Sequence, residues 1–135
     1  MNSETRTYPA QPYLMVAARV LMAAIFFLSG LSKLGAIEPT RAYMVSMHVS
    51  GVLVWPTLLF EIGSAILLIV GYQIRVFAVL LAAFCMVTAL IFHSQFGDQI
   101  QMIMFLKNVS MAGGFILLAC VGAGSLSFDA RAARR

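Results

Sequence analysis

The chain has 135 residues, of which 61% are hydrophobic and only 10% are charged, and its mean hydropathy is +0.94. About a quarter of the residues of a soluble domain are usually charged, so this composition indicates an integral membrane protein rather than a soluble helical bundle. The net charge of +4 comes with no basic stripe interleaved with aromatic residues, so nucleic acid is not an expected partner. The lipid bilayer is the first expected partner.

Four long apolar runs predict an all-α protein, an integral membrane four-helix bundle. Each run approaches the ~20 residues that cross ~30 Å of hydrocarbon at ~1.5 Å per residue. The runs form one membrane domain, residues 14–124, between a cytoplasmic N-terminal lead, residues 1–13, and a basic cytoplasmic tail, residues 125–135. The expected spans are residues 14–34, 52–71, 75–94 and 102–122.

Two connections between the spans have a predictable form. Between the first two spans, Pro39 suits the first turn of a helix, and the segment PTRAYMVSMH places Tyr43, Met44 and Met47 on one side. We therefore expect a short amphipathic helix on the outer membrane surface. The turn at 72–74 is so short that it predicts a tight antiparallel hairpin of the second and third spans.

The distribution of Lys and Arg predicts the orientation in the membrane. In a four-span protein both termini and the 72–74 turn share one side, and Lys and Arg are enriched on the cytoplasmic side. The terminal side has six such residues and the opposite side three, so we expect both termini in the cytoplasm, at a bacterial-type inner membrane. The six are Arg6, Arg19, Arg75, Arg131, Arg134 and Arg135, and the three are Lys33, Arg41 and Lys107.

Every expected span carries an ionisable side chain on a face that also contains small residues. Such faces usually turn to the interior of a membrane bundle, where polar groups find partners. Arg19 and Lys33 share one face of the first span because their spacing is a multiple of the helical repeat. The other spans contribute Glu61, His93 and Lys107, the last beside Asn108.

The depths of four of these groups predict that they meet in the outer half of the bundle. Lys33 and His93 lie at the outer ends of their spans. By the rise of a helix, Lys107 lies ~8 Å and Glu61 ~14 Å further in, and a lysine side chain covers most of that difference. An isolated ion at mid-bilayer costs at least about 2.5–3.5 kcal/mol, so partners or protonation are expected.

Simpler roles compete with a functional site. Lys33 and Arg19 also suit anchors that extend toward the headgroups. His93 suits an ordinary interfacial position, and Glu61 with Lys107 suits a purely structural pair.

Metal binding is a minor alternative. Met44, Met47 and His48 include soft ligands for Cu(I), but nine methionines in an apolar chain make such a grouping common. A haem between His48 and His93 would need the two rings to face each other, and nothing in the sequence fixes that. No metal centre is therefore expected, and no covalently bound cofactor.

Short motifs follow one another in a fixed order along the spans. They are RVLMAAIFFLSGLSKL from residue 19, EIG from 61 with Gly71, His93, KNVSMAGG from 107, GAG from 122 and SFD from 127. The ordered set resembles the DoxX family of small four-span membrane proteins, over about residues 19 to 129. The polar positions that carry the resemblance are Arg19, Lys33, Glu61, His93, Lys107 and Asp129.

The resemblance implies a link to membrane redox chemistry. Similar proteins include a subunit in thiosulfate:quinone oxidoreduction and proteins tied to oxidative-stress complexes or quinone resistance. We therefore predict a quinone- or small-anion-binding subunit that assists a redox reaction, with quinone as the candidate cofactor. The expected substrate-binding residues are Lys33, Lys107, Arg19 and Asn108, and the expected proton-transfer residues are Glu61 and His93.

The sequence has no flavin, haem or iron–sulfur motif, so electrons would come from a redox partner protein or from the substrate itself. If the chain is itself an enzyme, it is an oxidoreductase subunit that acts with quinone, alone or as a homo-oligomer. The alternatives are a non-enzymatic scaffold or assembly subunit of a membrane complex and a small-solute carrier.

Overall fold

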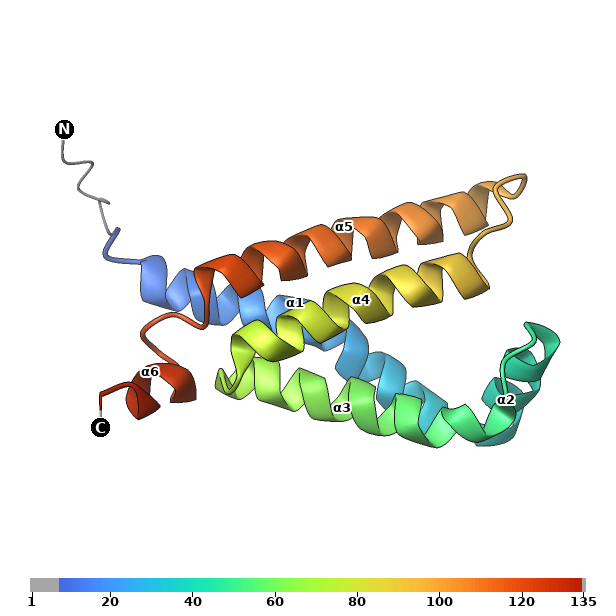
Figure 1. Ribbon diagram of the computed structural model, residues 1–135, viewed down its shortest axis with the longest axis horizontal. Coiled ribbons are helices and arrows are strands. Elements are labelled where there is room, and N and C mark those ends of the chain that lie inside the picture. Colours follow the sequence, from blue (N-terminus) through green and yellow to red (C-terminus); the bar gives the residue numbers. More distant parts are fainter. Residues whose placement is uncertain (1–7, 135) are drawn as a thin grey trace.

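A computed structural model describes residues 8–134, which form helices joined by short connections and include no strand (Figure 1). Four helical segments of this part of the chain are long and apolar enough to cross a membrane. The all-α, four-span prediction is therefore confirmed. The segments are α1 (Gln11–Leu34), the 3-10 turn η1 (Gly51–Leu53) continued by α3 (Val54–Val70), α4 (Ile74–Phe92) and α5 (Gln99–Val121).

The first and last of these helices begin earlier than their apolar runs, because their polar first turns have their own start signals. Pro12 lies in the first turn of α1, where a missing backbone N–H costs nothing. Asp98 is the N-cap of α5, and its carboxylate accepts hydrogen bonds from the amides of Ile100 and Gln101. Because these first turns are polar, hydrophobicity alone does not predict that they are helical.

The predicted hairpin of the second and third spans is confirmed. Gly71 ends α3 with a φ of 77°, and Gln73 precedes α4 with a φ of 52°, so the chain reverses in two left-handed steps. The amide of Gly71 donates to the carbonyl of Leu67, which closes the last turn of α3. A glycine suits the first step because it has no Cβ to clash in this conformation.

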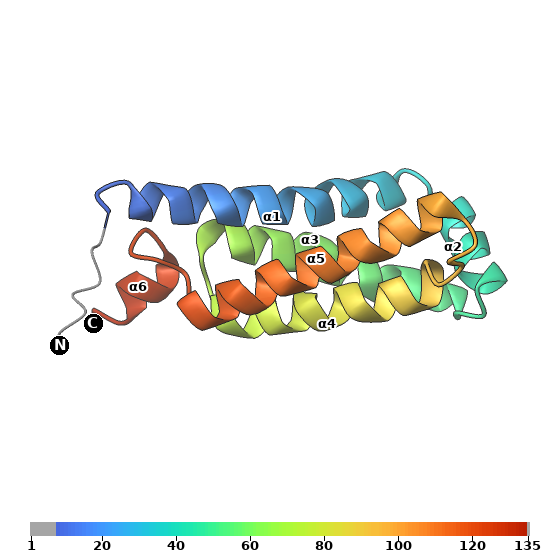
Figure 2. The ribbon, with the colours of Figure 1, turned by 90° about the horizontal axis from the view of Figure 1, so that it is seen from above.

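The four long helices pack mainly as two pairs, α1 with α3 and α4 with α5, and the α3–α4 turn joins the pairs. One end of the bundle, the turn end, carries residues 71–73, the start of α1 and the segment after α5. The other end, the loop end, carries α2 (Ile37–Ser46) and residues 93–98. Figure 1 shows the two pairs diverging toward the loop end, and Figure 2 shows the long helices running along one common axis.

Aromatic rings fill the middle of the bundle between the pairs. Phe26 of α1 contacts Phe84 of α4 and Phe115 of α5, with ring centroids 6.2 and 5.6 Å apart. Phe60 of α3 lies 5.1 Å from Phe84, so one aromatic cluster touches all four spans. Tilted ring pairs of this kind add stabilisation beyond the area that they bury.

The outer surface of the bundle is apolar. Leu21, Leu28 and Leu59 are 75%, 64% and 76% exposed, on α1 and α3. An apolar surface that continuous is unfavourable in water and suits contact with lipid.

The short helix predicted after the first span is confirmed as α2. Met44 is buried with Val54 and Leu58 of α3, and the ring of Tyr43 stacks on Phe92 of α4 with centroids 5.6 Å apart. These contacts hold α2 against the loop end of both helix pairs.

At the turn end, the C-terminal segment, residues 122–132, docks on the bundle and ends in α6 (Phe128–Ala132). The Asp129 carboxylate accepts hydrogen bonds from the amides of Gln73 and Ile74, at 2.8 and 3.0 Å. The amide of Asp129 donates to the carbonyl of Gly71 at 3.0 Å. The first part of the expected tail is therefore a fixed element that caps α4.

Candidate functional site

A cavity of about 310 Å³ lies toward the loop end, where the helix pairs diverge. All four spans and α2 contribute to its lining. This volume is at the lower end of the range for small-molecule sites, which are mostly apolar with a few convergent polar groups.

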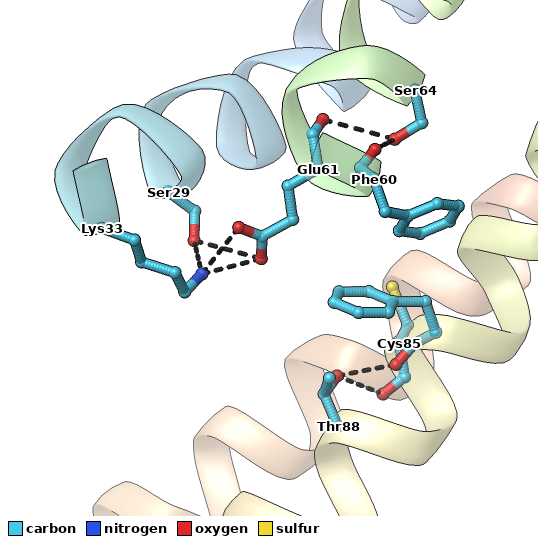
Figure 3. A network of polar contacts seen from close by, with 8 residues as sticks. Ser29, Lys33, Phe60, Glu61, Ser64, Cys85 and Thr88 are labelled. Atoms are coloured by element: carbon cyan, nitrogen blue, oxygen red, sulfur yellow. Dashed lines mark hydrogen bonds and ion pairs between the residues drawn. The ribbon is translucent and has the colours of Figure 1, made fainter. Parts of the chain in front are cut away.

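One wall of the cavity carries an ion pair between α1 and α3. The Lys33 ammonium lies 2.7 and 2.8 Å from the two carboxylate oxygens of Glu61, and it also donates to the Ser29 hydroxyl at 2.6 Å (Figure 3). The side chain of Glu61 is 6% exposed and that of Lys33 is 27% exposed. Glu61 therefore has a nearby counter-ion, and the pair adds no net charge to the cavity.

The sequence brings these groups together by simple spacing. Ser29 and Lys33 are four residues apart, so they lie one turn apart on the same face of α1. Gly30 lies between them, and a Cβ there would come within 2.5 Å of the Ile62 side chain. The absence of a side chain at this position lets α1 and α3 approach closely enough for the ion pair to form.

The other wall carries polar groups from α4 and α5. His93 ends α4, and its Nδ1 lies 2.9 Å from the Gln101 side-chain oxygen. The Asn108 side chain donates to the carbonyl of Met104 at 3.0 Å. Lys107 lines the cavity and is exposed. The ion pairs among residues 8–134 join Lys33 to Glu61 and Arg41 to Glu38. Within that part of the chain, Lys107 therefore has no acidic partner.

The rest of the lining is largely apolar. Phe26, Phe84, Phe92, Met104 and Met111 contribute to it. Such a surface suits an aromatic or aliphatic body, while the charged groups would select the polar end of a ligand.

The structure gathers five of the six predicted site residues around this cavity and separates the sixth. Lys33, Glu61, His93, Lys107 and Asn108 line it. The predicted proximity is thus observed, although Lys33 rather than Lys107 forms the ion pair with Glu61.

Arg19 is the separated residue. It lies fourteen residues before Lys33, or ~21 Å along α1, and is not part of the cavity lining. Its side chain is 1% exposed, and Nη2 donates to the carbonyl of Leu126 at 2.7 Å. Arg19 therefore holds the C-terminal segment at the turn end, away from the ligand position expected for it.

Of the residues of the minor metal alternative, only Met44 lines the cavity. Met44 is the buried residue of α2, Met47 is the C-cap of α2, and His48 is exposed with a φ of 60°. Within residues 8–134, no group of three or more His, Cys, Asp or Glu side chains is arranged to hold a metal ion.

Among the polar residues that were not singled out from the sequence, Ser29 and Gln101 contact predicted site residues, Ser29 with Lys33 and Gln101 with His93. Both follow from local spacing: Ser29 lies one turn before Lys33, and Gln101 lies in the first turn after the Asp98 cap. Ser and Gln carry no charge, so neither stands out in an apolar span until its neighbour is known.

The fold and the cavity define a class: a four-span helical membrane protein with a polar site enclosed between its helices. The family model described as DoxX matches residues 14–94, and this chain belongs to the DoxX family, as its motifs predicted. The match ends before Lys107 and Asn108, so the α5 wall of the cavity lies outside it.

Two relatives from Escherichia coli (strain K12) extend the similarity over most of the chain. The inner membrane protein YqjF is 36% identical over 115 residues, which are 85% of this chain and 88% of the relative. The inner membrane protein YphA is 36% identical over 129 residues, which are 90% of this chain and 92% of the relative. No solved structure gives a significant match. With four apolar spans, this chain is accordingly an inner-membrane protein of the same family.

Proposed function

We propose that this protein binds a quinone or a small anion in the loop-end cavity and assists membrane-associated redox chemistry. The observation that carries the proposal is the unequal state of the two cavity lysines. Lys33 is neutralised by Glu61, whereas Lys107 has no acidic partner among the described residues. The cavity thus has an excess positive charge, which stabilises an oxyanion or a quinone oxygen that becomes negative on reduction.

In this proposal the polar residues of the cavity have different roles in ligand binding and proton transfer. Lys107 and Asn108 bind the electron-rich end of the ligand, while the aromatic and methionine side chains contact its apolar body. Glu61 and His93 transfer protons, and the hydrogen bonds from Lys33 and Ser29 fix the position of the Glu61 carboxyl group. Arg19 serves the fold at the turn end and not the ligand.

The proposal also includes an orientation and a partner. Both termini face the cytoplasm, so the cavity opens in the outer half of the membrane. A redox partner protein in or on the membrane supplies or accepts the electrons, and quinone is the exchangeable cofactor.

Binding to the purified protein in lipid nanodiscs tests the proposal. We expect saturable binding of a decyl-substituted benzoquinone or of thiosulfate, measured by calorimetry. Lys107→Met should weaken that binding about tenfold or more, since a charge-assisted hydrogen bond is lost. Arg134→Gln removes one positive charge from an exposed position at the other end of the molecule and should leave binding unchanged. The proposal would be overturned if neither the quinone nor thiosulfate bound to the protein.

A structural role is the second candidate, and the Lys33–Glu61 pair favours it. The pair and Ser29 use most of their hydrogen-bonding capacity on one another across α1 and α3, as a helix lock would. A scaffold subunit would keep its fold and its partner proteins when Lys33→Met and Glu61→Leu are combined. Under the ligand-binding proposal, Lys107→Met, which leaves the Lys33–Glu61 pair in place, weakens quinone or anion binding, whereas a scaffold subunit has no such binding to lose.

A further inference from the structure

The imidazole of His93 is held from outside the cavity. His93 is the C-cap of α4, and its amide donates to the carbonyl of Ala89 at 3.0 Å. Its Nδ1 meets the side-chain oxygen of Gln101, in the first turn of α5, at 2.9 Å. That turn is itself fixed, because the Asp98 carboxylate accepts from the amides of Ile100 and Gln101 at 2.7 and 3.3 Å.

This contact selects one form of the ring. The side-chain oxygen of Gln101 can only accept a hydrogen bond, so Nδ1 of His93 carries the hydrogen. In the neutral ring, Nε2 then has the free lone pair and acts as an acceptor. His93 lines the cavity and Gln101 does not; Nδ1 is occupied by Gln101, and Nε2 makes no hydrogen bond among the described residues and is thus available to a ligand.

The hydrogen-bonding character of the cavity follows. Lys107 lies six residues after Gln101, or ~9 Å along α5, and its ammonium can only donate. Glu61, the acceptor of the opposite wall, is already bound by Lys33 and Ser29. Among the described residues, Nε2 of His93 is therefore an acceptor without a hydrogen-bond partner, and Lys107 is a cation without an acidic partner.

We infer that Gln101 is a positioning residue that holds His93 with its proton on Nδ1, and that the ligand offers a hydroxyl hydrogen to Nε2 and a second, electron-rich oxygen to Lys107. The ligand class is an apolar or aromatic body with two oxygens, at least one of them a hydroxyl, as in a hydroquinone. A fully deprotonated inorganic oxyanion has no hydrogen to offer. The ligand part of this inference rests on the proposed function, and the Gln101 part does not.

Nitrogen-15 NMR of histidine-labelled protein in lipid tests the positioning role without any ligand. The chain has two histidines, and His48 is exposed and lies outside the cavity. In a His48→Gln background, all histidine side-chain signals therefore come from His93. We expect the neutral ring of His93 to have a protonated Nδ1 and an unprotonated Nε2. Gln101→Leu should shift the ring toward the Nε2-protonated form, and Gln101→Glu, which keeps an acceptor, should preserve the original form.

A matched control separates this effect from general disturbance of the loop end. Gln95→Leu makes the same change at an exposed loop position and should leave the His93 signals unchanged. A ring protonated on Nε2 in the unsubstituted protein would mean that the Gln101 amide is turned the other way, and it would overturn the inference. An unchanged ring in folded Gln101→Leu would overturn it as well.

A pair of ligands of matched shape tests the hydroxyl requirement. A decyl-substituted hydroquinone, kept reduced, should bind about tenfold more tightly than its dimethyl ether, which lacks the hydroxyl hydrogens. Gln101→Leu should bring the two affinities within about threefold of each other, whereas Lys107→Met should weaken both. Equal binding of the two probes would overturn the hydroxyl requirement and leave the proposed function standing. Binding of no quinone, hydroquinone or anion probe would overturn the proposed function, and the NMR result would still decide the role of Gln101.

Discussion

Glu61 has both of its carboxylate oxygens within 2.8 Å of the Lys33 ammonium, so neither charge faces lipid alone. A buried ion pair contributes little net stability compared with apolar residues of similar volume, because both ions lose their hydration. Removal of one partner is far more costly, since the other charge is left unpaired. The pair is thus a local requirement of α1 and α3 whatever the ligand is.

At the residue scale, we predict that Glu61→Gln lowers the free energy of unfolding by about 3 kcal/mol, the low end for a broken buried pair because Lys33 keeps some exposure. The combination of Lys33→Met with Glu61→Leu should cost less than Glu61→Gln alone. Unfolding in mixed detergent micelles, followed by circular dichroism, measures both.

Glu38→Gln is the matched control for this prediction. It breaks an exposed pair with Arg41, 3.1 Å apart, and should cost less than about 1 kcal/mol. A loss for Glu61→Gln no larger than for Glu38→Gln would contradict the prediction.

The C-terminal segment shows how one element depends on side chains far away in the sequence. Asp129 caps α4, although 55 residues separate it from Ile74. Arg19 holds the same segment through the carbonyl of Leu126, and its Nη1 lies where a Cβ on Gly71 would be. Three separate parts of the chain therefore depend on one another at the turn end, namely α1, the α3–α4 turn and the C-terminal segment.

At the element scale, we predict that Asp129→Ala lowers stability by about 1–2 kcal/mol through loss of the α4 cap. It should also release residues 125–134 to proteolysis and speed hydrogen exchange at the amides of Gln73 and Ile74. Mass spectrometry of the digested and exchanged protein measures these effects.

Asp98→Ala is the comparison, because it removes the cap of α5 at the loop end, whereas the C-terminal segment docks at the turn end. It should leave the C-terminal segment protected. Equal protease resistance of the Asp129→Ala variant and the unsubstituted protein would show that Asp129 does not hold the segment.

The whole molecule places its polar groups unevenly along the membrane normal. The ion pair, His93 and Lys107 lie toward the loop end, and the Arg19–Asp129 contacts with the docked α6 lie at the turn end. The aromatic cluster fills the middle of the bundle. The cavity is therefore accessible from one side of the membrane in the proposed orientation.

At this scale, we predict that both termini are cytoplasmic, because the turn end carries most of the Lys and Arg. Green fluorescent protein fused after residue 135 should fluoresce, and alkaline phosphatase fused there should be inactive. The same reporters inserted after Gln95 should give the opposite pair of results. Active phosphatase at the C-terminus would reverse the orientation and with it the side on which the cavity opens.

Sequence reasoning reached the spans, the hairpin and α2, because each depends on local patterns of apolar residues, proline and glycine. It also brought Lys33, Glu61, His93 and Lys107 into the outer half of the bundle, because the rise of a helix converts residue number into depth. It predicted that Arg19 binds the substrate, because Arg19 and Lys33 lie on the same face of the first span. The two residues are, however, ~21 Å apart along that helix. Ser29 and Gln101 were not predicted, because the role of an uncharged polar side chain depends on the residues that it contacts in the folded protein.

The amino-acid sequence by itself determined the four membrane spans, because composition and local periodicity suffice for that, and its ordered motifs carried the resemblance to the DoxX family. Only the tertiary structure decided that Glu61 pairs with Lys33, that Lys107 lines the cavity with no acidic partner among the described residues, and that the Gln101 side chain contacts His93. The physical reason is that partner choice depends on the rotation and tilt of helices relative to one another. Packing across the whole bundle sets those two quantities, and no single helix encodes them.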